Sequence, residues 1–211
     1  MSTDPNTVDP ATAPHFTREG DDGRTRFGAF GEVAKHDNRL AAYSDCEEAN
    51  AAVGAALAFA GGLSVDVVNT LASVQHDMFD LASDLMAPAD SRDESAAHIT
   101  AEHIQRLERA IEHYSQDLYK AQGFVLPGGT VASSLIFQAR TTSRRAERTV
   151  WTAVEEYGDQ ISPLPAQYLN RLSALLFVLA RAANAEHGDT MWRPMASVAA
   201  PAEHERTGAD A

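Results

Sequence analysis

The chain has 211 residues, of which 44% are hydrophobic and 22% charged, as is typical of one globular domain with a substantial core. Its net charge of −13 argues against nucleic acid or an anionic membrane as a partner. The single cysteine excludes an internal disulfide, and neither a secretory signal nor an apolar run of ~20 residues is seen, so we expect a cytoplasmic protein.

The apolar spacing predicts an all-α protein between two tails. Residues 1–15 and 194–211 are poor in large apolar side chains, and we expect them to be disordered. Between them, residues 16–193 show helical periodicity and no convincing strand. Helices are expected at about 38–60, 65–85, 100–121, 131–157 and 163–185. Short loops between them predict a five-helix antiparallel bundle of ferritin-like topology, with the leucine-rich last helix at its centre.

Local signals mark several of these helix ends. The pair Gly61-Gly62 ends the first helix, and Ser64 is the expected N-cap of the second. Ser162 is expected to cap the fifth helix, with Pro163 at its first helical position.

A cluster of arginines on the fourth helix is the feature that bears most on function. It lies in the run ARTTSRRAER and comprises Arg140, Arg144, Arg145 and Arg148. Three of the four recur every fourth residue, which places them in one stripe about 6 Å apart. Such like charges need an anion nearby. Either the chain's own Glu147, Glu47 and Glu48 or a bound phosphate could supply it, and the pattern leaves both open.

Two glycine-containing segments are candidate anion sites. The polar run 17–25 precedes the first helix, and the PGGT turn at 127–130 leads into the arginine helix. A surface turn and a tight helix connection are the favoured structural alternatives.

Polar residues on the helices suggest further contacts. Asn170, Arg171 and Asn184 interrupt the apolar fifth helix and could face the arginine site. His76, Asp80 and Asp84 have a spacing that could hold a metal, but we expect a solvated face and no metal ligands.

In this order the segments resemble the PduO-like ATP:cob(I)alamin adenosyltransferases. The matching pieces are TREGDDG, FVLPGGT, ARTTSRRAER and YLNRLSALLFVLARAAN, within residues 17–194. The resemblance implies a homotrimer with an active site between neighbouring subunits. It also implies transfer of the 5′-deoxyadenosyl group of ATP to cobalamin reduced to Co(I), with Mg²⁺ beside the released triphosphate. A cobalamin reductase and an adenosylcobalamin-dependent mutase are the implied partners.

The resemblance also implies roles for individual residues. Phe124 would occupy the lower face of the corrin, which favours a four-coordinate Co(II) that is easier to reduce. Arg140 would pair across the bundle with Glu47, and Arg144 would hold the triphosphate. Two further nucleotide-site residues are Glu147 and Asn170. The loop expected to wrap the phosphates with Mg²⁺ contributes Thr17, Gly20, Asp22, Gly23 and Thr25.

Several positions depart from the family pattern around the expected site. Glu19 replaces a phosphate-binding threonine and would oppose ATP, although Arg24 and Arg26 could offset it. Glu47 replaces an aspartate, Phe137 a histidine and Ala174 another aspartate. Three hypotheses follow: a working adenosyltransferase; a divergent relative that binds a corrinoid or another anion without transfer, as a carrier, a regulator or an enzyme of different chemistry; and a purely structural bundle.

Overall fold

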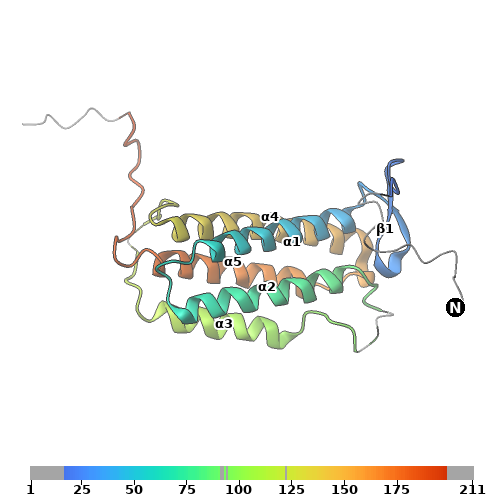
Figure 1. Ribbon diagram of the computed structural model, residues 1–211, viewed down its shortest axis with the longest axis horizontal. Helices are drawn as coiled ribbons and strands as arrows, with labels where there is room; N and C mark the ends of the chain where they lie inside the picture. Colours follow the sequence, from blue (N-terminus) through green and yellow to red (C-terminus); the bar gives the residue numbers. More distant parts are fainter. Residues whose placement is uncertain (1–16, 91–92, 94, 122, 199–211) are drawn as a thin grey trace, which may run out of the picture.

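Five helices form an antiparallel bundle within the part of the chain that the computed structural model describes, residues 17–90, 93, 95–121 and 123–198 (Figure 1). The helices are α1 (Asn38–Ala58), α2 (Val65–Leu85), α3 (Ala101–Ser115), α4 (Val131–Tyr157) and α5 (Leu164–Ala182). The predicted all-α bundle is confirmed. The expected tail 1–15 and most of the expected tail 194–211 lie outside the described residues. None of the described helices is long and apolar enough to cross a membrane.

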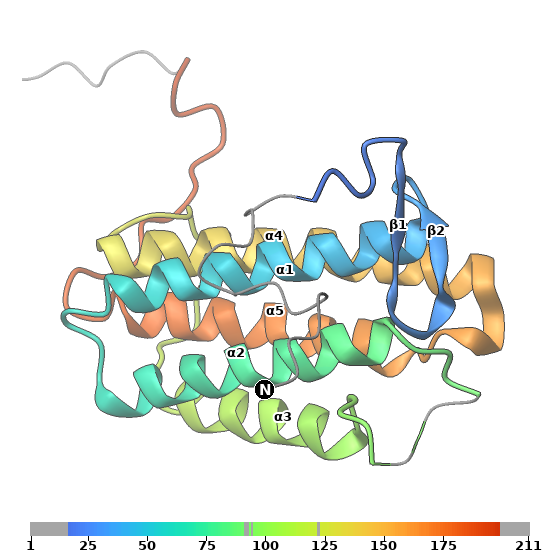
Figure 2. The same ribbon diagram turned by 45° about the vertical axis from the view of Figure 1, so that its right-hand side comes forward.

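The core is centred on α5, as the sequence predicted. Its leucines from Leu169 to Leu179 are completely buried, and the helix packs between α4 and α3. On the other side of α4 lies α1, which runs beside it through much of its length (Figures 1 and 2). The buried residues of α1 are mostly small, which allows close approach of the two helices: Ala42, Cys46, Ala49, Val53 and Ala56. Because the two helices pack closely, the backbone that carries the side chains on the outer face of the α1–α4 pair is rigid.

A short hairpin precedes the bundle and corrects the expectation that no strand forms. Strands β1 (Arg24–Arg26) and β2 (Glu32–Ala34) pair antiparallel, joined by a 3₁₀ turn, η1 (Gly28–Phe30). Three residues are too few for alternation to be recognised in a sequence. The hairpin lies where α1 begins and α4 ends (Figure 2), and Asn38 Nδ2 donates to Glu156 Oε2 there at 2.5 Å.

The helix starts were predicted better than the helix ends. The Ser64 hydroxyl accepts from the Val67 amide at 3.3 Å, which confirms this N-cap. The fifth helix begins one residue later than expected, with Pro163 as its N-cap, and a 3₁₀ turn, η2 (Gly158–Gln160), precedes it. The third helix ends at Ser115 instead of about residue 121, and α5 ends at Ala182 instead of about 185.

Candidate functional site

The arginines of α4 divide into a paired and an unpaired set. Arg145 forms ion pairs with Glu48 and, at 3.5 Å, with Asp45, both on α1. Within the described ranges no ion pair joins a carboxylate to the other three, Arg140, Arg144 and Arg148. The internal salt-bridge alternative therefore holds for Arg145 and not for the stripe that is spaced by four residues.

Arg140 is the most constrained member of the stripe. Its Nε is buried and has no hydrogen-bond partner among the described residues, while the guanidinium lies 5.4 Å from the centre of the Phe177 ring. Burial lowers the pKa of this guanidinium, and the charge of Arg144 adds to the effect. A partly buried cation of this kind is stabilised by an anion brought to it.

The pairing of Arg140 with Glu47 is not formed in this chain. Glu47 is exposed on α1 and accepts from the Tyr43 hydroxyl at 3.1 Å, one helical turn away on the same helix. This corrects the geometry that the resemblance implied, because the acid partner of Arg140 does not come from the chain's own α1.

Glu147 and Asn170 lie together between α4 and α5. The Asn170 amide donates to Glu147 Oε1 at 3.1 Å, and both residues share a neighbourhood with Arg171, whose Nη1 lies 3.4 Å from Asn170 Oδ1. Arg171 also pairs with Glu108 of α3 at 2.7 Å. The structure thus joins two of the expected nucleotide-site residues in one polar contact.

The hairpin and the segment that leads into it, residues 17–34 and together called the hairpin loop, surround a cavity of about 350 Å³. Its lining is wholly polar or glycine: Glu19, Gly20, Asp22, Arg24, Thr25, Arg26 and Glu32. Glycines at positions 20 and 23 have φ of 82° and 83°, which lets the loop turn back on itself. The Thr17 hydroxyl accepts from the Glu19 amide at 3.2 Å, outside the cavity lining.

Charges of both signs meet in this loop cavity. The Arg24 guanidinium donates to Glu32 Oε1 at 2.5 Å, and that hydrogen bond raises the pKa of Arg24. Asp22 Oδ1 accepts from the Arg24 amide at 3.1 Å. Arg24 is therefore already engaged, which leaves Arg26 as the cavity arginine without a partner in the described chain to offset Glu19.

Phe124 lies in the loop between α3 and α4 and is 76% exposed. Its ring packs edge-on against Trp192, with 5.9 Å between centroids. Trp192 lies in a polar segment after the last helix, and no sequence pattern predicted a role for it. An isolated Met-Trp pair in such a segment is the signal that could have revealed it.

The PGGT turn acts as a helix connection. The Thr130 hydroxyl caps α4 by accepting from the Ser133 amide at 3.1 Å, and the Thr130 amide donates to Asn184 Oδ1 at 3.1 Å. With that amide already bonded, the tight-connection alternative is favoured over anion binding. Asn184 consequently faces this turn instead of the Glu147–Asn170 contact.

The two remaining departures sit in different environments. Phe137 is buried and packs edge-on against Phe177 at 6.2 Å, so it extends the aromatic surface beside Arg140. Ala174 is exposed on α5. Neither position carries a group that contacts the arginine stripe through hydrogen bonds.

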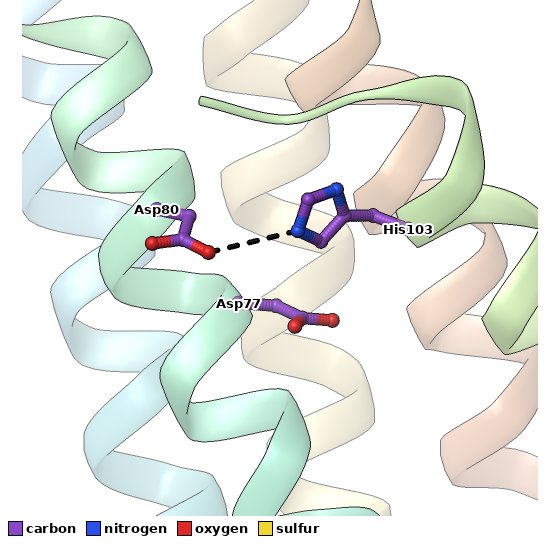
Figure 3. Close-up of side chains that lie close together, drawn as sticks. All are labelled: Asp77, Asp80 and His103. Carbon is purple, nitrogen blue, oxygen red and sulfur yellow. Dashed lines mark ion pairs between the residues drawn. The ribbon is translucent and has the colours of Figure 1, made fainter. Parts of the chain in front are cut away.

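An acidic and histidine cluster joins α2, α3 and α5, and it shares only Asp80 with the set considered in the sequence. Asp84 of that set is buried and accepts from the Ile99 amide at 3.0 Å, which corrects the expected solvated face at this position. Figure 3 shows Asp77, Asp80 and His103, whose ligand-type atoms lie within 4.8 Å of one another. Asp80 and His103 are 3.6 Å apart, and Asp77 already binds Arg106 and the Tyr168 hydroxyl, the latter at 2.8 Å. The arginine neutralises Asp77, so this cluster serves as a cross-link between helices.

The expected site residues lie in separate parts of one chain. The hairpin loop lies at the end where α1 begins (Figure 1). The arginine stripe and Glu147 are on α4, Glu47 is on α1, Asn170 is on α5, and Phe124 is in the loop before α4. One chain alone does not gather them into a single enclosed pocket among the described residues.

Comparison with known proteins identifies relatives of this chain. The chain is 47% identical over 180 residues to a corrinoid adenosyltransferase of Mycobacterium tuberculosis, covering 85% of this chain and 92% of the relative. A corrinoid adenosyltransferase of Bacillus subtilis is 34% identical over 175 residues, or 82% and 88% of the two chains.

Solved structures agree with the fold. A phenylalanine-to-histidine variant of a PduO-type ATP:corrinoid adenosyltransferase from Lactobacillus reuteri, complexed with cobalamin and ATP, is 32% identical. It superposes with a TM-score of 0.77 and covers 86% of this chain and 97% of its own. The sequence profile described as cobalamin adenosyltransferase matches residues 15–183. The chain therefore belongs to the cobalamin adenosyltransferase family.

Proposed function

We propose that this protein is an ATP:corrinoid adenosyltransferase. It transfers the 5′-deoxyadenosyl group of ATP to reduced cobalamin, and the products are adenosylcobalamin and triphosphate. In this reaction the electron pair of Co(I) forms the Co–C5′ bond while the C5′–O bond of ATP breaks. The negative charge that develops on the leaving triphosphate is what the protein has to stabilise.

The unpaired arginine stripe is the observation that carries this proposal. Arg140 has a buried Nε without a partner, and neither Arg144 nor Arg148 forms an ion pair in the described chain. A triphosphate with about four negative charges supplies the missing anion, because guanidinium groups bind phosphate oxygens through strong charge-assisted hydrogen bonds. The neighbouring Arg145 is excluded from this role by its own carboxylates.

The remaining residues have proposed roles around the stripe. Glu147 and Asn170, already in contact, bind the nucleoside end of ATP. The hairpin loop covers the phosphates, with Mg²⁺ carried in by the triphosphate and the Asp22 carboxylate nearby. Phe124 covers the lower face of the corrin and excludes an axial ligand, and its high exposure leaves its ring available for that contact.

We further propose a homotrimer with the active sites between subunits. Support comes from the separation of the loop, the stripe and Phe124 in one chain. It also comes from Arg140 and Glu47, neither of which has a hydrogen-bond or ion-pair partner on the facing helix among the described residues. In this assembly the bundle domain is residues 16–193, with 1–15 and 194–211 as tails. A cytoplasmic location, a cobalamin reductase and an adenosylcobalamin-dependent mutase complete the proposal.

The direct test is formation of product by the purified protein. ATP, Mg²⁺ and chemically reduced cobalamin are mixed with it, and adenosylcobalamin is followed by its visible spectrum while triphosphate is quantified. We expect both products in equal amounts and neither without ATP. No product above background, with cobalamin still bound, would instead support the divergent binding protein, an alternative favoured by the Glu19 carboxylate in the loop cavity.

A further inference from the structure

We propose that Arg181, Asp189 and Tyr119 form a clasp that positions Trp192 against Phe124 and so shapes the corrinoid end of the site. The inference rests on the proposed function for its corrinoid part. All three are positioning residues, because they act on the corrinoid through the two aromatic rings.

The clasp is a closed set of polar contacts between three segments. Arg181 Nε, at the end of α5, lies 2.7 Å from Asp189 Oδ2, and its Nη2 donates to the Tyr119 carbonyl at 2.8 Å. The Tyr119 hydroxyl donates to the same Asp189 oxygen at 2.9 Å and accepts from the Asp189 amide at 3.2 Å. Each residue is thus bound to both of the others.

The ion pair between Arg181 and Asp189 is buried, and it fixes the geometry of the clasp more than it adds stability. The side chains of Arg181 and Asp189 are only 9% and 3% exposed. Burying two charges costs about as much as their attraction returns, so apolar residues would stabilise the end of α5 equally well. What the charged pair adds is a fixed geometry, since the guanidinium has to meet a carboxylate and a carbonyl at the same time.

Backbone hydrogen bonds connect the clasp to Trp192, so the position of the clasp affects the position of this ring. Beyond Asp189, the Leu126 amide donates to the Thr190 carbonyl at 2.8 Å, and the Trp192 amide donates to the Phe124 carbonyl at 2.8 Å. A β-bridge pairs the residues between them. The clasp therefore holds the two segments together a few residues before each aromatic ring, so a shift of the clasp displaces the rings relative to each other.

A second contact links the clasp to the proposed nucleotide site. The Phe177 ring lies 5.8 Å from the Arg181 guanidinium and 5.4 Å from that of Arg140. The clasp is therefore packed one aromatic ring away from the arginine stripe, at the side of the bundle that the loop of Phe124 covers. Packing through the Phe177 ring connects the clasp to Arg140, and a structural element that aligns the corrinoid with the triphosphate needs such a connection.

The test compares three variants of the full chain that carry Trp151→Phe, so that Trp192 is the only tryptophan. Asp189→Asn removes the negative charge of the clasp and leaves the buried Arg181 guanidinium without its carboxylate. Tyr119→Phe removes one exposed hydroxyl, keeps the buried ion pair, and serves if the first variant does not fold. Tyr114→Phe is the matched control, because it deletes a hydroxyl that binds Thr70 at 2.8 Å between α2 and α3.

Two measurements are made on each variant: acrylamide quenching of Trp192, and the equilibrium Kd values of hydroxocobalamin and of ATP. Trp192 is 50% exposed in the parent, so loss of the clasp is expected to raise the quenching constant by up to about twofold. It is also expected to weaken cobalamin binding on the order of tenfold, because a displacement of about 1 Å is costly in a preorganised site. The Kd of ATP and both values of the control should stay within about twofold of the parent.

The proposal is overturned if quenching of Trp192 does not change, if the control changes as much as Tyr119→Phe, or if the Kd values of ATP and cobalamin rise in equal proportion. Neither measurement requires turnover. A parent that forms no adenosylcobalamin therefore contradicts the proposed function, while the comparison of the variants still decides whether the clasp exists.

Discussion

Replacing Glu19 by threonine should strengthen ATP binding. The Glu19 carboxylate lines the loop cavity in which the phosphates are proposed to lie. Of the two arginines that line the same cavity, Arg24 is engaged by Glu32 at 2.5 Å, so Arg26 is left to offset both Glu19 and Asp22. A negative charge therefore faces the triphosphate, and threonine would exchange it for a neutral hydroxyl that can donate to a phosphate oxygen.

The size of the effect follows from Coulomb's law. One carboxylate about 6 Å from one phosphate charge, at an effective dielectric constant of about 40 to 80, is repelled by about 0.7–1.4 kcal/mol. Because the Glu19 side chain is exposed, solvent and salt screen the interaction and the high-dielectric end applies. Glu19→Thr should therefore lower the Kd of ATP about threefold.

Calorimetric titration of ATP with Mg²⁺ at low and high salt measures this change. The gain should shrink as salt rises, since screening weakens the repulsion that the substitution removes. The matched control is Glu112→Thr, which deletes an exposed carboxylate on α3 away from the loop cavity. An affinity that does not rise, or that rises equally in the control, would refute repulsion by Glu19.

Three further predictions concern the bundle itself. Asp77→Asn leaves Arg106 on α3 without its carboxylate and should lower the free energy of unfolding by about 1–3 kcal/mol, or several degrees in Tm. A divalent cation that raises the Tm of the parent but not that of the variant would indicate a metal site instead. Burial raises the pKa of the Cys46 thiol, so it should resist thiol reagents at pH 8 until the protein unfolds, and immediate labelling would contradict its buried position. Gly129→Ala places a Cβ 2.1 Å from Asn184 Oδ1 and should lower the denaturation midpoint more than Gly62→Ala, which has the same φ of 103° and open space around it; equal losses would mean that backbone strain alone matters.

The bundle could be predicted because its signals are local. Apolar spacing and cap residues such as Ser64 act within one or two turns, and both are visible in a sequence. The segment after α3 is bound instead by a distant group, since Arg181 Nη2 donates to the Tyr119 carbonyl beyond the end of the helix. Contacts between segments 62 residues apart leave no periodic signal.

The candidate site shows the same division. The spacing of Arg140, Arg144 and Arg148 predicted a stripe on one helix, but not which arginine the acids of α1 would neutralise. Arg145 points toward α1 and takes Glu48, a consequence of helix packing that a linear sequence does not express. Trp192 was missed for a related reason, because its contact with Phe124 depends on the return of the chain after α5.

Calorimetric titration of ATP into Arg144→Ala tests the central claim most directly, with Arg145→Ala as the neighbouring control. Losing one charge-assisted contact of about 1.5–3 kcal/mol should raise the Kd of ATP by about tenfold to a hundredfold. The control, which removes an arginine already paired with the chain's own acids, should bind ATP within about twofold of the parent. Unchanged ATP affinity in Arg144→Ala, or an equal loss in both variants, would contradict a triphosphate held by the unpaired stripe.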